Sequence, residues 1–169
     1  MFRLAFALSA LLTLNSVGFA QNRGTATPSR PAATPSASPR PAAPSNPAPL
    51  VYSQSTGRIT QNGTTIGTGY SGAGHTAAQG RNNPQMQGTP NVGPIPTGNY
   101  NIGAAHASRN TGPMVMNLTP SGHNAQGRSG FQIHGNNATN NASHGCIILP
   151  PNARSTISNN GNTRLRVVP

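Results

Sequence analysis

The 169-residue chain has no aspartate, glutamate, lysine or tryptophan, and its only side chains that are always charged are 11 arginines. Without carboxylates the chain cannot form a paired-carboxylate glycosidase site, an aspartic-protease dyad, a Ser-His-Asp triad or a carboxylate-built Ca²⁺ or Mg²⁺ site. Without lysine it has no Schiff base and no P-loop cation. The chemistry must therefore come from one cysteine, five histidines, hydroxyls, amides and arginine.

The formal net charge is +11, and the sequence pI is about 12.0. Such a charge favours anionic partners, which include nucleic acid, acidic lipid and acidic cell-wall polymers. Aromatic residues make up only 4% of the chain, and no basic helix is evident. Because few side chains can stack on bases, we expect no nucleic-acid partner.

Residues 1–20 are predicted to be a secretory signal peptide. Arg3 supplies the positive start, 4–14 is an apolar run of 11 residues, and Gly18-Phe19-Ala20 is a small-x-small cleavage site. The apolar run is too short to span about 30 Å of hydrocarbon as a helix. A buried N-terminal helix is the alternative. The signal peptide predicts a secreted or periplasmic protein with no transmembrane segment in the mature chain.

Residues 21–49 are predicted to be a disordered linker, because eight of these 29 residues are proline and seven are alanine. The rest, 50–169, is long enough for one domain with a single core. We therefore expect a catalytic or binding domain at 50–169 behind a cationic tether.

Short β-branched segments alternate with Gly, Asn and Pro turns in this domain, which predicts a mostly all-β sandwich or small barrel. The sequence 61–63 (Gln-Asn-Gly) predicts a type I′ hairpin turn. One short helix near the C-terminus is predicted at 153–158, with Pro151 in its first turn and Gly161 just beyond its end. The expected strands are 50–52, 58–60, 64–66, 100–102, 115–118, 131–133, 146–149 and 165–168.

The only cysteine, Cys146, follows two histidines closely in the sequence. His134 and Gly135 come after an apolar segment, and Ser143-His144-Gly145 immediately precede Cys146. If one strand ends at His134 and the next begins at Cys146, imidazole and thiol meet across neighbouring strands. A Cys–His pair supports acyl transfer, because the imidazole takes the thiol proton and the thiolate attacks. The alternative is that Cys146 is only a small buried core residue.

This pattern resembles the signature of the YkuD-type L,D-transpeptidases: an upstream His134-Gly135 and then Ser143-His144-Gly145-Cys146. The segment 92–100 is similar to the family's Pro-Thr-Gly stretch that enters a strand, and 127–131 leads into the His-Gly as in its relatives. The similarity covers most of 50–169 and points to the small branch that includes L,D-transpeptidase-like effectors of type VI secretion. It implies an L,D-transpeptidase-like sandwich or barrel.

The resemblance also implies roles for individual residues. Cys146 would be the nucleophile and His134 the base, its imidazole held by a carbonyl oxygen. Ser143 and His144 would shape the site with Gly135 beside them. The backbone of Gly145 and Cys146 would bind the oxyanion.

The sequence departs from the family pattern at two places. The loop between His134 and Ser143 is shorter than in most members, which implies a more open site. Ile148 stands where a polar residue or arginine is often found, so the residue that holds the substrate's carboxylate is undefined. Arg128 is a candidate for that part.

The resemblance implies a peptidoglycan-modifying L,D-transpeptidase or L,D-carboxypeptidase that acts on stem peptides through a thioacyl-enzyme, with no cofactor. Two alternatives stay open. The first is another secreted Cys-His peptidase or a sortase-like transferase, for which Arg154, Arg164 or Arg166 would supply an arginine after the cysteine. The second is a non-catalytic cationic module that binds the cell envelope. His75, His106 and His123 lack the spacing of a zinc site and are expected in turns or loops. The oligomeric state is left open.

The lack of side-chain carboxyl groups predicts unusual stability in acid. Ordinary proteins lose stability between about pH 5 and pH 1, because carboxylates with depressed pKa values take up protons. In this chain, only the protonation of histidines that are held neutral in the fold would lower the free energy of unfolding, as the pH falls below about 6.5. Between about pH 4 and pH 2 the free energy of unfolding should then be nearly constant, which urea midpoints at pH 7, 4 and 2 would measure. A fall of several kcal/mol between pH 4 and pH 2 would contradict this expectation.

Overall fold

The computed structural model describes residues 47–169. The fold below is that of these residues. The predicted signal peptide at 1–20 and most of the predicted linker at 21–49 lie outside the described residues. Within 47–169, no helix is long and apolar enough to cross a membrane.

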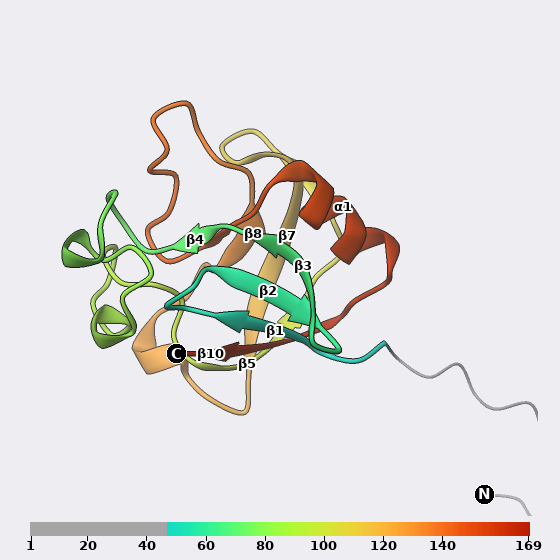
Figure 1. The fold of residues 1–169 in the computed structure, drawn as a ribbon, viewed down its shortest axis with the longest axis horizontal. Coiled ribbons are helices and arrows are strands. Elements are labelled where there is room, and N and C mark those ends of the chain that lie inside the picture. The colour runs from blue at the N-terminus through green and yellow to red at the C-terminus, as the bar shows by residue number, and fades with distance from the viewer. Residues whose placement is uncertain (1–46) are drawn as a thin grey trace, which may run out of the picture. The chain divides into compact units, whose positions relative to one another are not determined.

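The domain is mostly β, as the sequence predicts, with ten strands, three short 3₁₀ turns and one α-helix (Figure 1). The 3₁₀ turns are Ala77–Gln79, Pro84–Met86 and Ala125–Gly127, and the helix α1 is Pro151–Asn159. The strands are β1 (Leu50–Ser53), β2 (Arg58–Gln61), β3 (Thr64–Thr68), β4 (Tyr70–Ser71), β5 (Gly98–Ile102), β6 (His106–Ser108), β7 (Gly112–Ser121), β8 (Gln132–His134), β9 (Ile147–Ile148) and β10 (Arg164–Val168).

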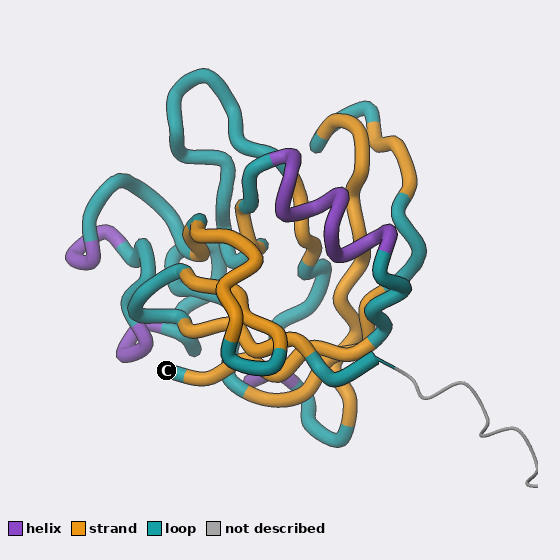
Figure 2. The backbone as a smooth tube through the Cα atoms, turned by 45° about the vertical axis from the view of Figure 1, so that its right-hand side comes forward, coloured by secondary structure: helices purple, strands orange, loops and turns teal. Residues whose placement is uncertain are grey.

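The strands form one sheet in the order β3-β2-β1-β10-β5-β7-β8-β9-β4, with β6 paired to β7. Its two edge strands, β3 and β4, are separated in the chain only by Gly69. The sheet must therefore curl until its edges adjoin, which makes a rolled, barrel-like layer (Figure 2). A Cβ at Gly69 would collide with the carbonyl oxygen of Ile148, so the crossing between the two edges requires glycine.

The inside of the rolled sheet is filled by one apolar cluster. Tyr52, Tyr100 and Ile133 are among its fully buried members, and Ala153 and Ile157 of α1 join them. The helix packs against β3 and β7, where Ala153 faces Gly67. The helix thus contributes its apolar residues to the same core as the sheet.

All eight predicted strand segments are found as strands, and the predicted helix and hairpin are confirmed. Asn62 and Gly63 have φ values of 50° and 79°, the positive pair that a type I′ turn needs. Two strands, β4 and β6, were not predicted from the sequence. β4 has only two residues, and it is defined by its pairing with β9 rather than by a local pattern.

Candidate active site

The turn that carries Cys146 is held by three side-chain donors, one within the turn and two from other segments. The carbonyl oxygens of three successive residues each accept one hydrogen bond. Arg128 Nη2 donates to His144 O at 3.1 Å, Ser71 Oγ to Gly145 O at 3.0 Å, and Ser143 Oγ to Cys146 O at 2.7 Å. The backbone before the thiol is therefore fixed in orientation before any substrate arrives.

Ser143 is the centre of this turn. Its fully buried hydroxyl donates to the carbonyl of Cys146 and accepts from the N–H groups of Gly72 and Gly145, at 2.9 and 3.1 Å. This differs from the expectation that Gly145 and Cys146 together bind the oxyanion, because the Gly145 N–H is already bonded within the turn. No hydrogen bond among residues 47–169 engages the Cys146 N–H, which leaves that group as the backbone donor next to the sulfur.

Gly145 is required by its conformation and by its neighbour. Its φ is +128°, a region that side-chain-bearing residues rarely adopt, and a Cβ there would collide with Nη2 of Arg128. Arg128 is 9% exposed and donates to the carbonyls of Gln87, Gly93 and Pro94 as well as His144. Both terminal nitrogens are thus occupied, so the geometry supports a role in fixing the turn and not the capture of a substrate carboxylate.

His134 ends β8 and is held by a backbone carbonyl. Its Nδ1 lies 2.8 Å from the carbonyl oxygen of Gly135, which can only accept, so Nδ1 carries the proton. The neutral imidazole therefore has Nε2 free to take a proton. The resemblance implies a carbonyl partner for this imidazole, and in the structure Gly135 supplies a carbonyl within hydrogen-bond distance.

His134 ends β8, and Cys146 immediately precedes β9, the parallel neighbour of β8. Ile133 pairs with Ile147 and His134 with Ile148, so continuation of the register places Cys146 opposite Gln132. Ile133 and Ile147 point into the core, and the alternate residues therefore point to the other face. Strand spacing and rise put the Cα atoms of His134 and Cys146 about 8 Å apart, a diagonal that these side chains can bridge.

Burial keeps both groups neutral. The pKa of His134 is lowered below 6.5, first by burial and then by the nearby cation of Arg154, against the raising effect of the Gly135 bond. The pKa of the Cys146 thiol is raised above 9.0 by burial, although the Gln132 backbone bond and the charge of Arg128 oppose the shift. The thiol itself points to Gly130 O at 3.8 Å, so the resting pair is a neutral thiol and a neutral imidazole.

The remaining predicted residues fall into two groups. His144 is exposed, and only its backbone contributes to the turn. Arg164 and Arg166 are exposed on β10, whereas Arg154 is 6% exposed and lies beside Gly135.

Of the other histidines, His75 and His123 are in loops, whereas His106 begins the strand β6 and does not lie in the expected turn or loop. In the part of the chain described, no three His or Cys residues come close enough to hold a metal.

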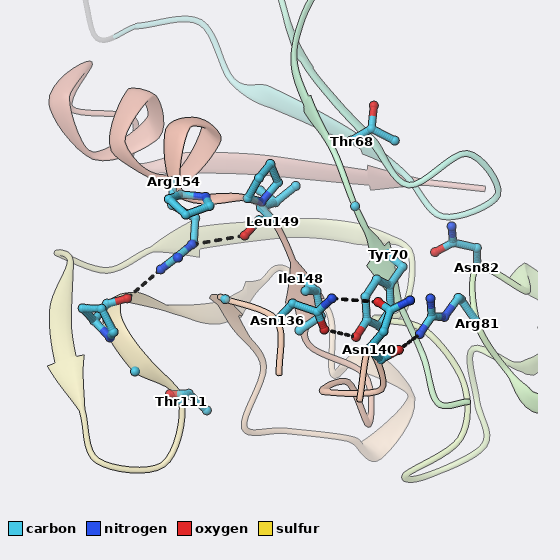
Figure 3. Close-up of a pocket in the computed structure, with 16 residues that line it drawn as sticks. Thr68, Tyr70, Arg81, Asn82, Thr111, Asn136, Asn140, Ile148, Leu149 and Arg154 are labelled. Atoms are coloured by element: carbon cyan, nitrogen blue, oxygen red, sulfur yellow. Dashed lines mark hydrogen bonds between the residues drawn. The ribbon is translucent and has the colours of Figure 1, made fainter. Parts of the chain in front are cut away.

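Two adjoining cavities lie along the face of His134. The smaller, about 290 Å³, is lined by His134, and the larger, about 750 Å³, is lined by Ile148 and Tyr70 of the same face (Figure 3). They share four lining residues, Thr111, Gly112, Gly135 and Asn136. The space beside the histidine is therefore open enough for an extended ligand.

The family model of the Tlde1 domain matches residues 65–169, which includes the Cys146 turn, His134 and both cavities. The chain belongs to the Tlde1 domain family. The Tlde1 domain is a type VI effector domain and is compatible with peptidoglycan-modifying activity. No curated protein and no solved structure matches the chain significantly.

Two residues of this Tlde1 domain were missed by the sequence analysis. Ser71 holds the carbonyl of Gly145 from a position 74 residues away, and Arg154 was considered only for a sortase-like site. Neither lies within the Ser-His-Gly-Cys motif, and a serine between tyrosine and glycine carries no local signal. Only the pairing of β4 with β9 brings Ser71 to the turn.

Replacing Ser143 with alanine should damage the turn. The variant Ser143→Ala leaves the Cys146 carbonyl and two N–H groups without their partner, which should cost about 1–3 kcal/mol in the free energy of unfolding. The urea midpoint measures this, with the exposed Ser121→Ala as the matched control. Equal midpoints for the two variants would contradict the role given to Ser143.

The directions of the two pKa shifts predict a broad pH range for a reaction between these groups. Protonation of His134 should lower kcat/KM only below pH 6.5, and alkylation of Cys146 by iodoacetamide should rise with an apparent pKa above 9.0. The variant His144→Gln should show the same fall of kcat/KM at low pH, because His144 is exposed and is not one of the two reacting residues. An alkylation rate that stays constant down to pH 6 would instead indicate a thiolate–imidazolium pair.

Proposed function

We propose that this Tlde1 domain is a cysteine L,D-transpeptidase or L,D-carboxypeptidase that acts on peptidoglycan stem peptides. The observation that carries the proposal is the placement of Cys146 immediately before β9, the parallel neighbour of the strand that His134 ends, with His134 Nδ1 fixed by Gly135 O. The similarity of the motif to YkuD-type L,D-transpeptidases supports the same assignment. The predicted signal peptide would bring the domain to the periplasm, where the polymer lies.

The first half of the reaction forms a thioacyl-enzyme. His134 Nε2 takes the thiol proton, and Cys146 Sγ attacks the carbonyl carbon of the diamino-acid residue in the stem. The Cys146 N–H donates to the oxygen on which negative charge develops. When the C–N bond breaks, the proton on His134 passes to the leaving amine, and D-alanine departs.

The second half returns the thiol. An amine of a second stem, or water, attacks the thioester carbonyl while His134 takes its proton. Collapse of the intermediate breaks the C–S bond, and the proton returns to sulfur. An amine gives a new peptide bond, and water gives the shortened stem. The open cavities beside His134 admit either acceptor.

Removal of the nucleophile tests the proposal. Cys146→Ala should abolish release of D-alanine from tetrapeptide stems, measured by chromatography of the products, with an unchanged urea midpoint. Residual activity within about tenfold of the unmodified protein would contradict the assignment, since a lost nucleophile costs far more. The non-catalytic alternative instead predicts that envelope binding persists in Cys146→Ala and that no D-alanine is released by either protein.

The two histidines should differ sharply in the same assay. His134→Ala removes the base and should lower single-turnover acylation by about 10²–10⁴-fold, whereas His144→Ala should change it little, because His144 contributes only backbone. A carbapenem adduct on Cys146, detected by mass spectrometry, reports the same step. The reverse ranking would assign the base to His144.

A further inference from the structure

Arg154 presents one side of its guanidinium to the larger cavity. It comes from the first turn of α1 and is 6% exposed. Nε donates to Leu149 O at 3.2 Å, and Nη1 donates to Pro113 O at 2.6 Å and Met114 O at 3.1 Å. Within residues 47–169, Nη2 has no hydrogen-bond partner, and a Cβ built on Gly135 would lie 3.1 Å from it.

A second guanidinium lies at the other end of this cavity. Arg81 stacks over the ring of Tyr70 at 3.6 Å, and it donates through Nε to Gly74 O and through Nη2 to the carbonyl of Asn140. Figure 3 shows Arg154 and Arg81 on opposite sides, with Ile148 between them. The hydrogen-bond acceptors of both cations are all backbone carbonyl oxygens.

No side chain of the sequence can neutralise these two charges, because the sequence has no aspartate or glutamate. No carboxylate side chain lines the cavity, so a bound ligand can supply the anion. A carboxylate suits a guanidinium in shape and charge, because two oxygens can accept from neighbouring N–H groups. The fixed position of Arg154 reduces the entropy lost when such an anion binds.

The walls between the two arginines suit a short peptide. Tyr70, Ile148 and Leu149 are buried residues that supply an apolar surface, and the side chains of Asn82 and Asn136 line the same space. Asn136 already bonds through Oδ1 and Nδ2, and Asn82 Oδ1 accepts from the Ser71 N–H, which leaves Asn82 Nδ2 as the side-chain amide donor for a peptide carbonyl. The cavity therefore offers charge at its ends and an apolar wall with one amide donor between them.

The cavity is continuous with the face that carries the reacting pair. Gly135 lines both cavities, its carbonyl orients His134, and Ile148 pairs directly with His134. His134 lines the smaller cavity and Cys146 lines neither, so a peptide whose reacting carbonyl lies at Cys146 would pass His134 before it reaches Arg154. The motif itself offers no cation in this direction, because Ile148 replaces the polar residue or arginine expected there.

We propose that the larger cavity is a carboxylate-binding subsite for the peptide substrate, with Arg154 as its principal binding residue and Arg81 as the second. The proposal rests on the proposed function for the identity of the peptide. It assigns the substrate's free carboxylate to arginines outside the Ser-His-Gly-Cys motif.

The test is a binding measurement on the Cys146→Ala protein, which cannot turn the ligand over. Three tetrapeptide stems are compared by calorimetry: the free acid, its C-terminal amide, and the amide of the diamino acid's side-chain carboxyl. One of the two amides should bind about 10–100-fold more weakly than the free acid. Arg154→Gln should weaken binding of the free acid by a similar factor and leave the affinity of that amide unchanged.

Two further variants separate binding from folding. Arg154→Gln removes the hydrogen bonds to the Pro113 and Met114 carbonyls, which changes the support of β7. Arg81 is only half-buried, so Arg81→Gln serves as a second test of whether the affinity for the free acid depends on a cavity arginine. The control is Arg166→Gln, which loses the same charge on exposed β10. Two results together overturn the proposal. The first is that both amides bind the Cys146→Ala protein within twofold of the free acid. The second is that Arg154→Gln and Arg81→Gln bind the free acid within twofold of the Arg166→Gln control.

The subsite and the proposed function can fail separately. If the protein with Cys146 releases no D-alanine, but binding shows the expected dependence on Arg154 and carboxylate, the subsite stands and the enzymatic proposal fails. If D-alanine is released and KM at pH 8 is the same for Arg154→Gln and Arg166→Gln, the enzymatic proposal stands and the subsite fails. His134 is neutral in both variants at that pH, so a change in its pKa does not affect the comparison.

Discussion

The buried cations Arg128 and Arg154 are held by backbone carbonyl oxygens, because the chain has no carboxylate side chain to hold them. Arg128 donates to four carbonyls and Arg154 to three, and the neutral ring of His134 is likewise held by one through Nδ1. A carbonyl carries only a partial charge, so these bonds fix direction without cancelling the positive charge. The site consequently combines rigid positioning with a positive field that favours an anionic ligand and a developing oxyanion.

The same constraint determines the state of the reacting pair. With a carboxylate partner, the imidazole of His134 would be drawn toward its charged form. A carbonyl partner stabilises the imidazolium much less, and burial together with Arg154 keeps the ring neutral. Burial also keeps the Cys146 thiol protonated, and Arg128 only partly offsets it. In the proposed reaction, the proton would therefore be transferred when the thiol attacks, and not before substrate binds.

Much of the architecture could be predicted from local pattern. Alternating β-branched segments gave eight strand locations, Asn62-Gly63 predicted the hairpin through its positive φ values, and Pro151 and Gly161 bracketed the helix. The strands β4 and β6 could not be found this way, because two or three residues carry no periodicity. They exist only because β9 and β7 offer unpaired edges to them.

The sequence by itself determined which chemistry is available: one thiol, and histidines and arginines without aspartate or glutamate partners. It also indicated, through the spacing of His134 and Cys146, that the two could share neighbouring strands. Only the tertiary structure decided which groups surround them. Ser71 reaches Gly145 across 74 residues, and Arg154 reaches Pro113 across 41. Local spacing cannot encode such contacts, because they arise when the sheet rolls until β4 adjoins β9 and α1 packs onto β7.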